Sequence, residues 1–378
     1  MTDTGPKVST RGRSAPPTDP RPRTGPGTDL ERGDVVVELR GTEVPPEEDD
    51  TALTGIVSSA MLMHAVSALV GLGVIDALAD GPLTLTDLAR RLQVEEDRLL
   101  IVVRPATVAG LLRENGPDLF TLSPSGERLR ADDPSGLRDL FHMCTYGDFL
   151  QAWTHLEEAI RTGRTAFELH TGRELFGYLG DNREEATIFH RAMNASAPVP
   201  ALLERADLPH EGTVADLGGG EGAALATILR ARPHLEGILF DLPEVVEGAA
   251  PLLRAEDVDR RCTIVGGSFF DRVPPGADVY LMTRVMQNWS DADALRILRN
   301  VREAMHDTSR LLITGHLPER ERPSRYLEAM SLSMFVLYGA PLRTSERYEE
   351  LFHRAGLTLR AVHRVPEGES IMDVRRAP

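Results

Sequence analysis

The feature that most constrains the fold is an alternation of strand-like and helix-like segments that begins at residue 213. Short apolar runs typical of buried strands occupy residues 213–217, 237–240, 262–265, 279–283 and 310–314. Segments with helical periodicity lie between some of them, for example at residues 223–231 and 291–305. Strands separated by helices form right-handed βαβ units, so the pattern predicts an α/β domain with a mostly parallel sheet. Ligands of such sheets bind at the carboxyl ends of the strands.

The first of these strands runs into a glycine cluster, Asp216-Leu217-Gly218-Gly219-Gly220-Glu221-Gly222. Glycine tolerates positive φ and allows a ligand to approach the backbone closely. The spacing differs from the Gly-x-Gly-x-x-Gly loop that binds the pyrophosphate of a dinucleotide. The Asp216 carboxylate would repel a pyrophosphate, but it suits a cationic amino-acid group. A plain structural turn is the alternative interpretation of the glycines, and Asp241 argues against it, because a carboxylate at the end of the second strand can accept hydrogen bonds from a ribose.

Composition excludes several other classes of protein. The chain has 58 acidic residues and 42 lysines and arginines, for a net charge of -16, and no basic stripe, so we expect no nucleic-acid partner. Its two cysteines, Cys144 and Cys262, are far apart, which predicts neither a disulfide framework nor a zinc site. We find no apolar run of the ~18 residues that a membrane helix needs and no signal peptide. These features predict a cytoplasmic protein with no membrane partner.

Changes in composition divide the chain into four predicted regions. Residues 1–50 are rich in proline and poor in large apolar residues, which predicts a disordered tail. Residues 51–135 have the order helix, short helix, helix, hairpin that is typical of a winged-helix domain. The short helix would begin at Thr84 or Thr86, and the hairpin would turn at residues 115–118. Residues 136–205 follow a helical pattern, and residues 206–378 form the α/β domain.

The winged-helix outline admits two functions. On a basic surface it would indicate a DNA-binding transcription factor, but the acidic balance of this chain opposes that interpretation. The helix expected at residues 61–78 is more apolar than a lone surface helix requires, and we predict that it is buried between the two subunits of a homodimer.

The glycine cluster and Asp241 resemble the first two motifs of plant-type and bacterial small-molecule O-methyltransferases, and the resemblance continues through Asn288-Trp289-Ser290-Asp291. It spans roughly residues 55–375 and is closest to the group that acts on aromatic, anthracycline-like polyketides. It implies a Rossmann-like class I methyltransferase domain, preceded by a mainly α-helical, winged-helix-like dimerisation domain. It also implies S-adenosylmethionine as cofactor, a small aromatic molecule as substrate, and no metal.

The same resemblance implies roles for individual residues. The predicted cofactor-binding residues are Asp216, Gly218, Gly220, Asp241, Leu242, Ser268, Phe269 and Thr283. The predicted substrate-binding residues are Met193, Asn288, Met334 and Tyr338. Ser268 stands where the family usually has Asp, and Thr283 stands where plant members have Lys.

The expected catalytic centre departs from the family. The position of the usual general base, a histidine, is Gln287, and a primary amide cannot take up a proton near neutral pH. The two glutamates that normally support the histidine are replaced by Thr314 and Leu342. We therefore expect Gln287 and Asn288 to line a site that transfers methyl groups by proximity and orientation.

Two alternatives stay open at this point. A relocated base is one of them, and His316 is a candidate because it shares the strand face of Thr314, while His142 belongs to a helical region expected to border the pocket. The other is a non-methylating enzyme on the same fold, a hydroxylase or a pericyclic catalyst, in which bound S-adenosylmethionine acts as a fixed charge.

Overall fold

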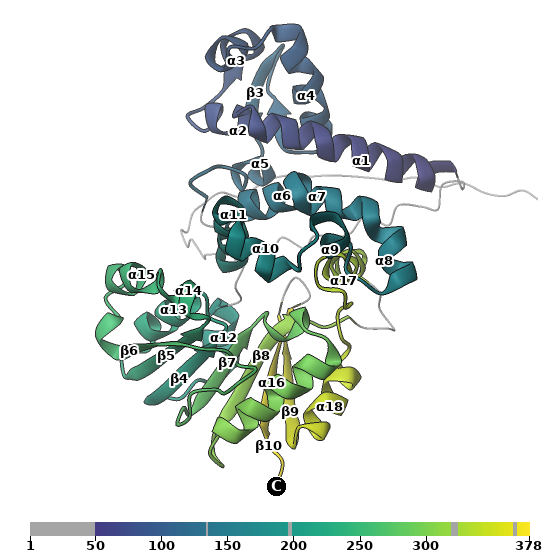
Figure 1. Ribbon diagram of the computed structural model, residues 1–378. Helices are drawn as coiled ribbons and strands as arrows, with labels where there is room; N and C mark the ends of the chain where they lie inside the picture. Colours follow the sequence, from purple (N-terminus) through teal and green to yellow (C-terminus); the bar gives the residue numbers. More distant parts are fainter. Residues whose placement is uncertain (1–49, 134, 196–198, 319–323, 366–368) are drawn as a thin grey trace, which may run out of the picture. The chain divides into compact units, whose positions relative to one another are not determined.

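The computed structural model describes residues 50–133, 135–195, 199–318, 324–365 and 369–378. Residues 52–378 form one compact unit. Figure 1 shows it running from purple helices through teal helices to a green and yellow sheet with its covering helices. The tail predicted for residues 1–50 lies, apart from its last residue, outside the described residues.

The first part of the unit has the predicted winged-helix order. Its helices are α1 (Asp50–Gly71), α2 (Val74–Ala77), α3 (Leu85–Leu92) and α4 (Glu96–Val108). Strands β1 (Leu83–Thr84), β2 (Leu112–Glu114) and β3 (Leu119–Leu122) form an antiparallel sheet in the order β1-β3-β2, so the hairpin is confirmed. The cap of α3 is Thr84, whose Oγ1 accepts a hydrogen bond from the backbone N–H of Asp87 at 3.1 Å.

The apolar N-terminal helix differs from the prediction. The chain leaves the helical conformation after α1, and Gly73 adopts a φ of 81° at the start of α2, so residues 61–78 are not one helix. Residues 52–71 of α1 are long and apolar enough to cross a membrane. An 18-residue stretch within them has a mean hydropathy of 1.7, and 17% of that stretch is buried in the structure. The expectation that no apolar segment reaches the length of a membrane span was therefore wrong, because the helix extends further towards the N-terminus than predicted.

Short helices form the middle of the unit. They are α5 (Pro124–Glu127), α6 (Leu137–Thr145), α7 (Gly147–Ala152), α8 (Leu156–Thr162), α9 (Ala166–Thr171), α10 (Leu175–Asp181) and α11 (Arg183–Ala195), with a 3₁₀ turn at Trp153–His155. Their core contains Phe149, Phe167 and Phe189. It also contains Val336 and Leu337 of α17 (Arg325–Tyr338), so the helical region takes one of its packing partners from far along the chain (Figure 1).

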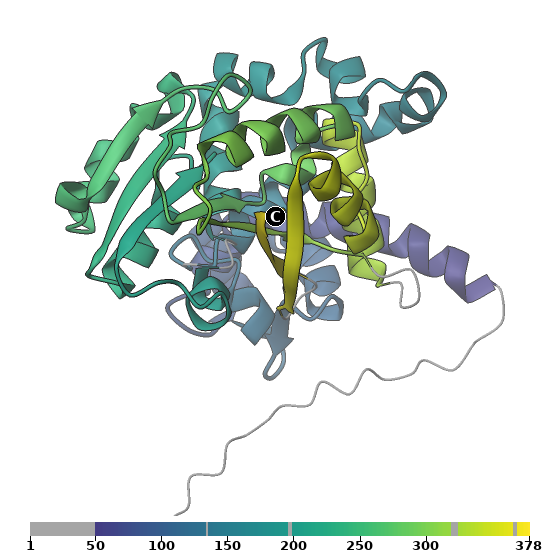
Figure 2. The same cartoon turned by 90° about the horizontal axis from the view of Figure 1, so that it is seen from below.

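The last part is a seven-stranded sheet in the order β6-β5-β4-β7-β8-β10-β9. Its strands are β4 (Gly212–Leu217), β5 (Leu235–Asp241), β6 (Cys262–Gly266), β7 (Val279–Thr283), β8 (Arg310–His316), β9 (Leu357–Arg364) and β10 (Glu369–Arg376). Strands β4 to β8 are parallel, which confirms the prediction. The antiparallel strands β9 and β10 were not predicted; Figure 2 shows them in yellow beside the green strands.

Helices cover both faces of the sheet. One core packs against α16 (Asp291–Ala304) and α18 (Ser345–Arg354). The opposite core packs against α12 (Val199–Arg205), α13 (Ala223–Ala231) and α15 (Ala249–Ala255); α14 (Pro243–Val246) and a 3₁₀ turn at Asp259–Arg261 connect β5 to β6. Because helices cover both faces, the ends of the strands are the part of the sheet that remains open to a ligand.

Candidate active site

A cavity of about 820 Å³ lies at the carboxyl ends of the parallel strands. The ends of β4, β5, β7 and β8 line one side of it, and residues of α6, α11 and α17 line another. The structure thus brings together every residue for which we predicted a cofactor or substrate contact, and all of them line this cavity. The strand ends and the helices of the middle region together form the candidate site.

The glycine turn after β4 has two positions at which a Cβ would collide with neighbouring side chains and two at which φ is positive. Gly218 has a φ of 73°, and a Cβ there would lie 2.8 Å from a methyl carbon of Val285. A Cβ on Gly219 would lie 2.7 Å from Oδ2 of Asp216 and 2.6 Å from Leu239. Gly220 has a φ of 60° and open space around it. Gly218, Gly219 and Gly220 all line the cavity, so a ligand can approach the backbone of this turn closely.

Two carboxylates lie at the same end of the cavity. Asp216 is 1% exposed, and neither of its oxygens has a hydrogen-bond partner among the described residues. Burial, together with the negative charge of Asp241, raises the pKa of Asp216 to about 7. Burial also raises the pKa of Asp241, although its carboxylate accepts hydrogen bonds from the backbone N–H groups of Gly220 at 2.8 Å and Leu242 at 2.7 Å.

These carboxylates fit S-adenosylmethionine. An unpartnered buried carboxylate beside a second one calls for a cationic hydrogen-bond donor, and the amino-acid part of this cofactor supplies an ammonium group. Asp241 retains lone pairs for ribose hydroxyls, because each of its oxygens accepts one backbone hydrogen bond. Leu242, Ser268 and Phe269 line the cavity nearby, where an adenine ring would lie.

The wall provided by the helices is apolar and aromatic. Phe176 stacks on Trp289 with ring centroids 5.6 Å apart and lies 5.8 Å from the ring of Tyr338. Met193 of α11 and Met334 of α17 complete this wall. Aromatic rings and flexible thioethers are well suited to bind a flat aromatic molecule.

Gln287 and Asn288 lie in a 3₁₀ turn, Met286–Asn288, between β7 and α16. The Gln287 side chain is fixed by the protein: its Oε1 accepts a hydrogen bond from the His316 backbone N–H at 3.4 Å, and its Nε2 lies 3.8 Å from the Met334 sulfur. Asn288 lines the cavity beside it. The amide at the position of the usual base is therefore a buried structural contact that carries no titratable proton.

A buried arginine that the sequence analysis did not single out holds this turn. Arg343, 6% exposed, donates hydrogen bonds to the backbone oxygens of Met286 at 2.9 Å and of Trp289. It also donates to the Asp291 carboxylate at 2.7 Å, at the start of α16. Arg343 precedes α18 in the sequence, so no local pattern indicated that it would reach the turn. The sequence offered one hint, Asp291 in the Asn288-Trp289-Ser290-Asp291 motif, but it did not show that the partner of this carboxylate is Arg343.

The candidate relocated bases behave differently. His316 is 5% exposed and lines the cavity, and burial with the nearby Arg284 lowers its pKa to about 4. A histidine with that pKa is neutral at pH 7 and a weak base. His142 belongs to α6, which lines the cavity as expected, but its own ring stacks on Tyr146 at 5.0 Å and is not among the lining residues. Among the described residues, no group of three or more His, Cys, Asp or Glu side chains is arranged to hold a metal.

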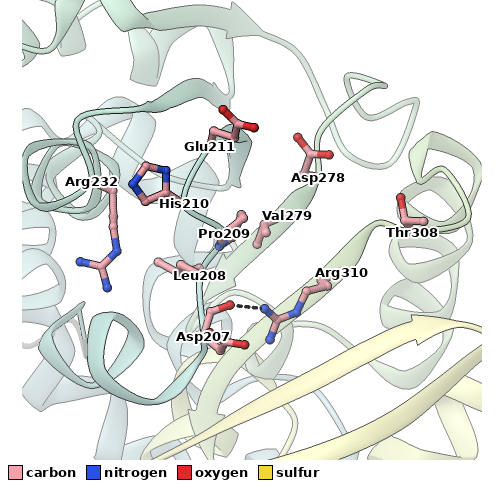
Figure 3. A pocket seen from close by; sticks show the side chains of 10 residues that line it. All are labelled: Asp207, Leu208, Pro209, His210, Glu211, Arg232, Asp278, Val279, Thr308 and Arg310. Carbon is pink, nitrogen blue, oxygen red and sulfur yellow. Dashed lines mark hydrogen bonds between the residues drawn. The ribbon is translucent and has the colours of Figure 1, made fainter.

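A second recess, of about 570 Å³, opens at the amino ends of the strands (Figure 3). Three of its charged side chains, Arg232, Asp278 and Arg310, already bind the protein. Arg310 donates hydrogen bonds to the backbone oxygens of Asp207 and Ala206, both at 2.6 Å, and Asp278 accepts one from the Thr213 N–H at 2.9 Å. Because these groups tie the start of β4, β7 and β8 together, the recess serves the packing of the strand ends.

The chain matches the O-methyltransferase domain family over residues 153–358. It is 34% identical to a phenazine O-methyltransferase from Lysobacter antibioticus over 307 residues, which cover 80% of this chain and 89% of the relative. It is 31% identical to aclacinomycin 10-hydroxylase from Streptomyces purpurascens over 324 residues, which cover 83% of this chain and 86% of the relative. The crystal structure of CalO1, a methyltransferase of calicheamicin biosynthesis with S-adenosylhomocysteine bound, has a TM-score of 0.77 at 31% identity, covering 88% of this chain and 100% of that structure.

Proposed function

The chain belongs to the O-methyltransferase family, and from that premise we propose what it methylates and how. It is a methyltransferase that uses S-adenosylmethionine. We infer that the acceptor is a hydroxyl of an aromatic, polyketide-like natural product. The observation that carries this proposal is the composition of the cavity. It has the buried carboxylate of Asp216 and the partly buried carboxylate of Asp241 at one end, and an aromatic and methionine wall at another. Asn288 lines the same cavity and would orient the acceptor.

The mechanism relies on position rather than on a protein base. When bound, S-adenosylmethionine supplies a methyl group on a positively charged sulfur. Asp216 and Asp241 would hold the cofactor, and the turn fixed by Arg343 would hold Asn288 against the acceptor. Correct placement of two reactants lowers a barrier by several kcal/mol, on the order of 7 or more in well-oriented systems. Gln287 takes no proton, and His316 at a pKa of about 4 is a poor base, so the acceptor hydroxyl must itself be acidic.

One assay tests this function. The protein is incubated with S-adenosylmethionine and a panel of hydroxylated aromatic polyketides, and mass spectrometry looks for a methyl-sized mass gain together with S-adenosylhomocysteine. Asp241→Ala is the matched control, because it should reduce both products in parallel. Tight cofactor binding without methylation of any acceptor would favour a non-methylating enzyme, in which the sulfonium acts as a fixed charge.

We also propose the homodimer that the sequence predicts, but with a different contact surface between the two subunits. Val66, Leu69 and Val70 of α1 fill the core of their own domain, so these residues do not face a partner. The exposed apolar side chains lie earlier on the helix: Leu53 is 65% exposed, and Met61 is 67% exposed. Their spacing of eight residues puts them on one face of the helix. We assign the contact between two subunits to this face.

Light scattering tests the dimer. Leu53→Lys together with Met61→Lys should give the monomeric mass at micromolar concentration, whereas Ile160→Lys, which changes an equally exposed residue on α8, should leave the dimer intact. A monomeric wild-type protein would contradict the assignment.

For this soluble enzyme, we propose a cytoplasmic location, in agreement with its two free cysteines, Cys144 and Cys262.

A further inference from the structure

The last residue of β8 places an unpartnered polar side chain at the cavity. His316 is only 5% exposed, and its Nδ1 has no hydrogen-bond partner among the described residues. The imidazole lines the cavity. Buried polar atoms nearly always have a partner in the protein, in ordered water or in a ligand. A side chain of this kind, at the wall of a large cavity, is a candidate for contact with a ligand.

The surroundings of His316 form a polar end of the cavity. Glu369 of β10 is its direct partner in the antiparallel register, and the Glu369 carboxylate accepts a hydrogen bond from Arg284 Nε. The ring of Tyr326 lies 5.9 Å from the imidazole. Arg284, Tyr326 and Glu369 all line the cavity with His316. This cluster contrasts with the aromatic and methionine wall.

Arg284 adopts a backbone conformation that is rare for its residue type. Its φ is 57°, in the left-handed region that favours glycine. Such residues persist where the surrounding structure holds them, and they gather at functional sites. Here the conformation brings the guanidinium to the end of β7, beside the carboxylate of Glu369 and within electrostatic range of His316.

The charge of this cluster indicates which ligand group it would take. The pKa of His316 lies near 4, so the imidazole is neutral at pH 7 and acts as a hydrogen-bonding group. Its neighbour Arg284 is permanently cationic and carries only hydrogen-bond donors, which suits an acceptor oxygen with partial negative charge, while its ion pair with Glu369 keeps the cluster close to neutral. A carbonyl oxygen conjugated to an ionisable hydroxyl meets both conditions, because it shares the charge when the hydroxyl loses its proton.

The same carbonyl would also make the acceptor hydroxyl more acidic, which the mechanism requires. Without a protein base, the acceptor hydroxyl has to be more acidic than an ordinary phenol, whose pKa is about 10. A conjugated carbonyl provides that acidity. The His316 backbone contacts the Gln287 side chain at 3.4 Å, so the polar end adjoins the turn that would hold the reacting hydroxyl.

We propose that His316, supported by Arg284, forms a subsite that binds a carbonyl oxygen of the acceptor, and that the enzyme thereby selects hydroxyquinones and related phenols conjugated to a carbonyl. This inference rests on the proposed function, because it takes the acceptor to be an aromatic hydroxyl compound. His316 acts as a specificity-determining residue in this scheme and transfers no proton.

Binding of two probes tests the subsite without turnover. The probes are 2-hydroxy-1,4-naphthoquinone and 2-naphthol, which share a fused ring and a hydroxyl, and affinity is measured by calorimetry with saturating S-adenosylhomocysteine. His316→Phe keeps a ring but removes both nitrogens, and it should weaken binding of the naphthoquinone by about 3- to 10-fold, the range for a lost hydrogen bond, with 2-naphthol changed less than twofold. His316→Asn keeps a polar group and should recover part of the loss.

The controls separate a polar contact from packing. Met330→Leu changes another cavity-lining residue and should leave the preference between the two probes unchanged. Equal weakening of both probes by His316→Phe, in a variant with wild-type circular dichroism, would assign the residue to packing and overturn the proposal. An unchanged affinity for the naphthoquinone, or failure of the wild type to bind it, would overturn it as well. Failure of the proposed function gives a different result. In that case the naphthoquinone binds and His316→Phe weakens its binding as expected, but no methylated product forms.

Discussion

Replacement of Asp216 by Asn should change stability and cofactor affinity in opposite directions. The carboxyl is 1% exposed, and its pKa rises from 3.8 to about 7 in the folded protein. A tenfold change in an ionisation constant corresponds to about 1.36 kcal/mol, so ionisation of Asp216 costs the ligand-free protein about 4 kcal/mol at pH 8 relative to the unfolded chain. Asp216→Asn is nearly isosteric and removes this charge. It should stabilise the ligand-free protein at pH 8 by up to about 4 kcal/mol.

The pH dependence has a definite sign. Between the unfolded pKa near 3.8 and the folded pKa near 7, the folded state holds the proton that the unfolded state has released. The contribution of Asp216 to the free energy of unfolding therefore falls as pH rises through this window, and it is constant below and above it. The difference between Asp216→Asn and the wild type should disappear as pH falls towards 4, which provides an internal control.

Cofactor binding should respond in the other direction. The carboxylate offers a charged partner for the ammonium group of S-adenosylmethionine, and hydrogen bonds to charged groups contribute about 1.5–3 kcal/mol. Asp216→Asn should then weaken binding by about 10- to 100-fold at pH 8. Urea unfolding of the ligand-free protein at pH 5 and pH 8, with calorimetry of cofactor binding, measures both effects. A variant that is less stable than the wild type at pH 8, or that binds the cofactor equally well, would refute this reasoning.

Three further predictions concern the other residues of the site. Asp241→Ala should weaken cofactor binding by about 1–3 kcal/mol in calorimetry, because it removes a charged acceptor for the ribose; unchanged affinity would exclude that role. Arg343→Lys should lower kcat by about 10²-fold while the KM for the cofactor stays within twofold, because the turn that orients the acceptor loosens. Arg347→Lys is the control, because Arg347 also contacts Asp291 but its side chain is half-exposed. The pH profile of kcat should follow the pKa of the acceptor hydroxyl and stay the same in His142→Ala; a profile that shifts with this variant would reveal a relocated base.

The sequence was informative wherever a local pattern carries the signal. The strand, glycine turn and Asp216 are contiguous, and positive φ at Gly218 and Gly220 is a local requirement that only glycine meets without strain. The parallel strands β4, β7 and β8 are buried along most of their length and form apolar runs in the sequence. The strands β9 and β10 were missed because both mix polar and apolar residues. Strand β9 lies at the edge of the sheet, and β10, although largely buried between β8 and β9, contains Glu369, Ser370 and Asp373.

The residues that hold the turn could not be predicted in this way. Arg343 reaches the turn across 57 residues of sequence, and the interaction depends on how α16 and α18 pack on the sheet. His142 and His316 are equally plausible bases in the sequence, yet only one lines the cavity, and its burial depresses the basicity that the role requires.

The amino-acid sequence by itself therefore determined the α/β fold, the cofactor turn and the loss of the usual base at Gln287, because each depends on residues that are neighbours in the chain or on the identity of one side chain. The tertiary structure alone decided the charge states of Asp216 and His316, since desolvation and nearby charges arise only when distant segments pack. It also decided that Val336 and Leu337 of α17 pack into the core of the helical region. Both depend on long-range packing, which has no local signature in the sequence.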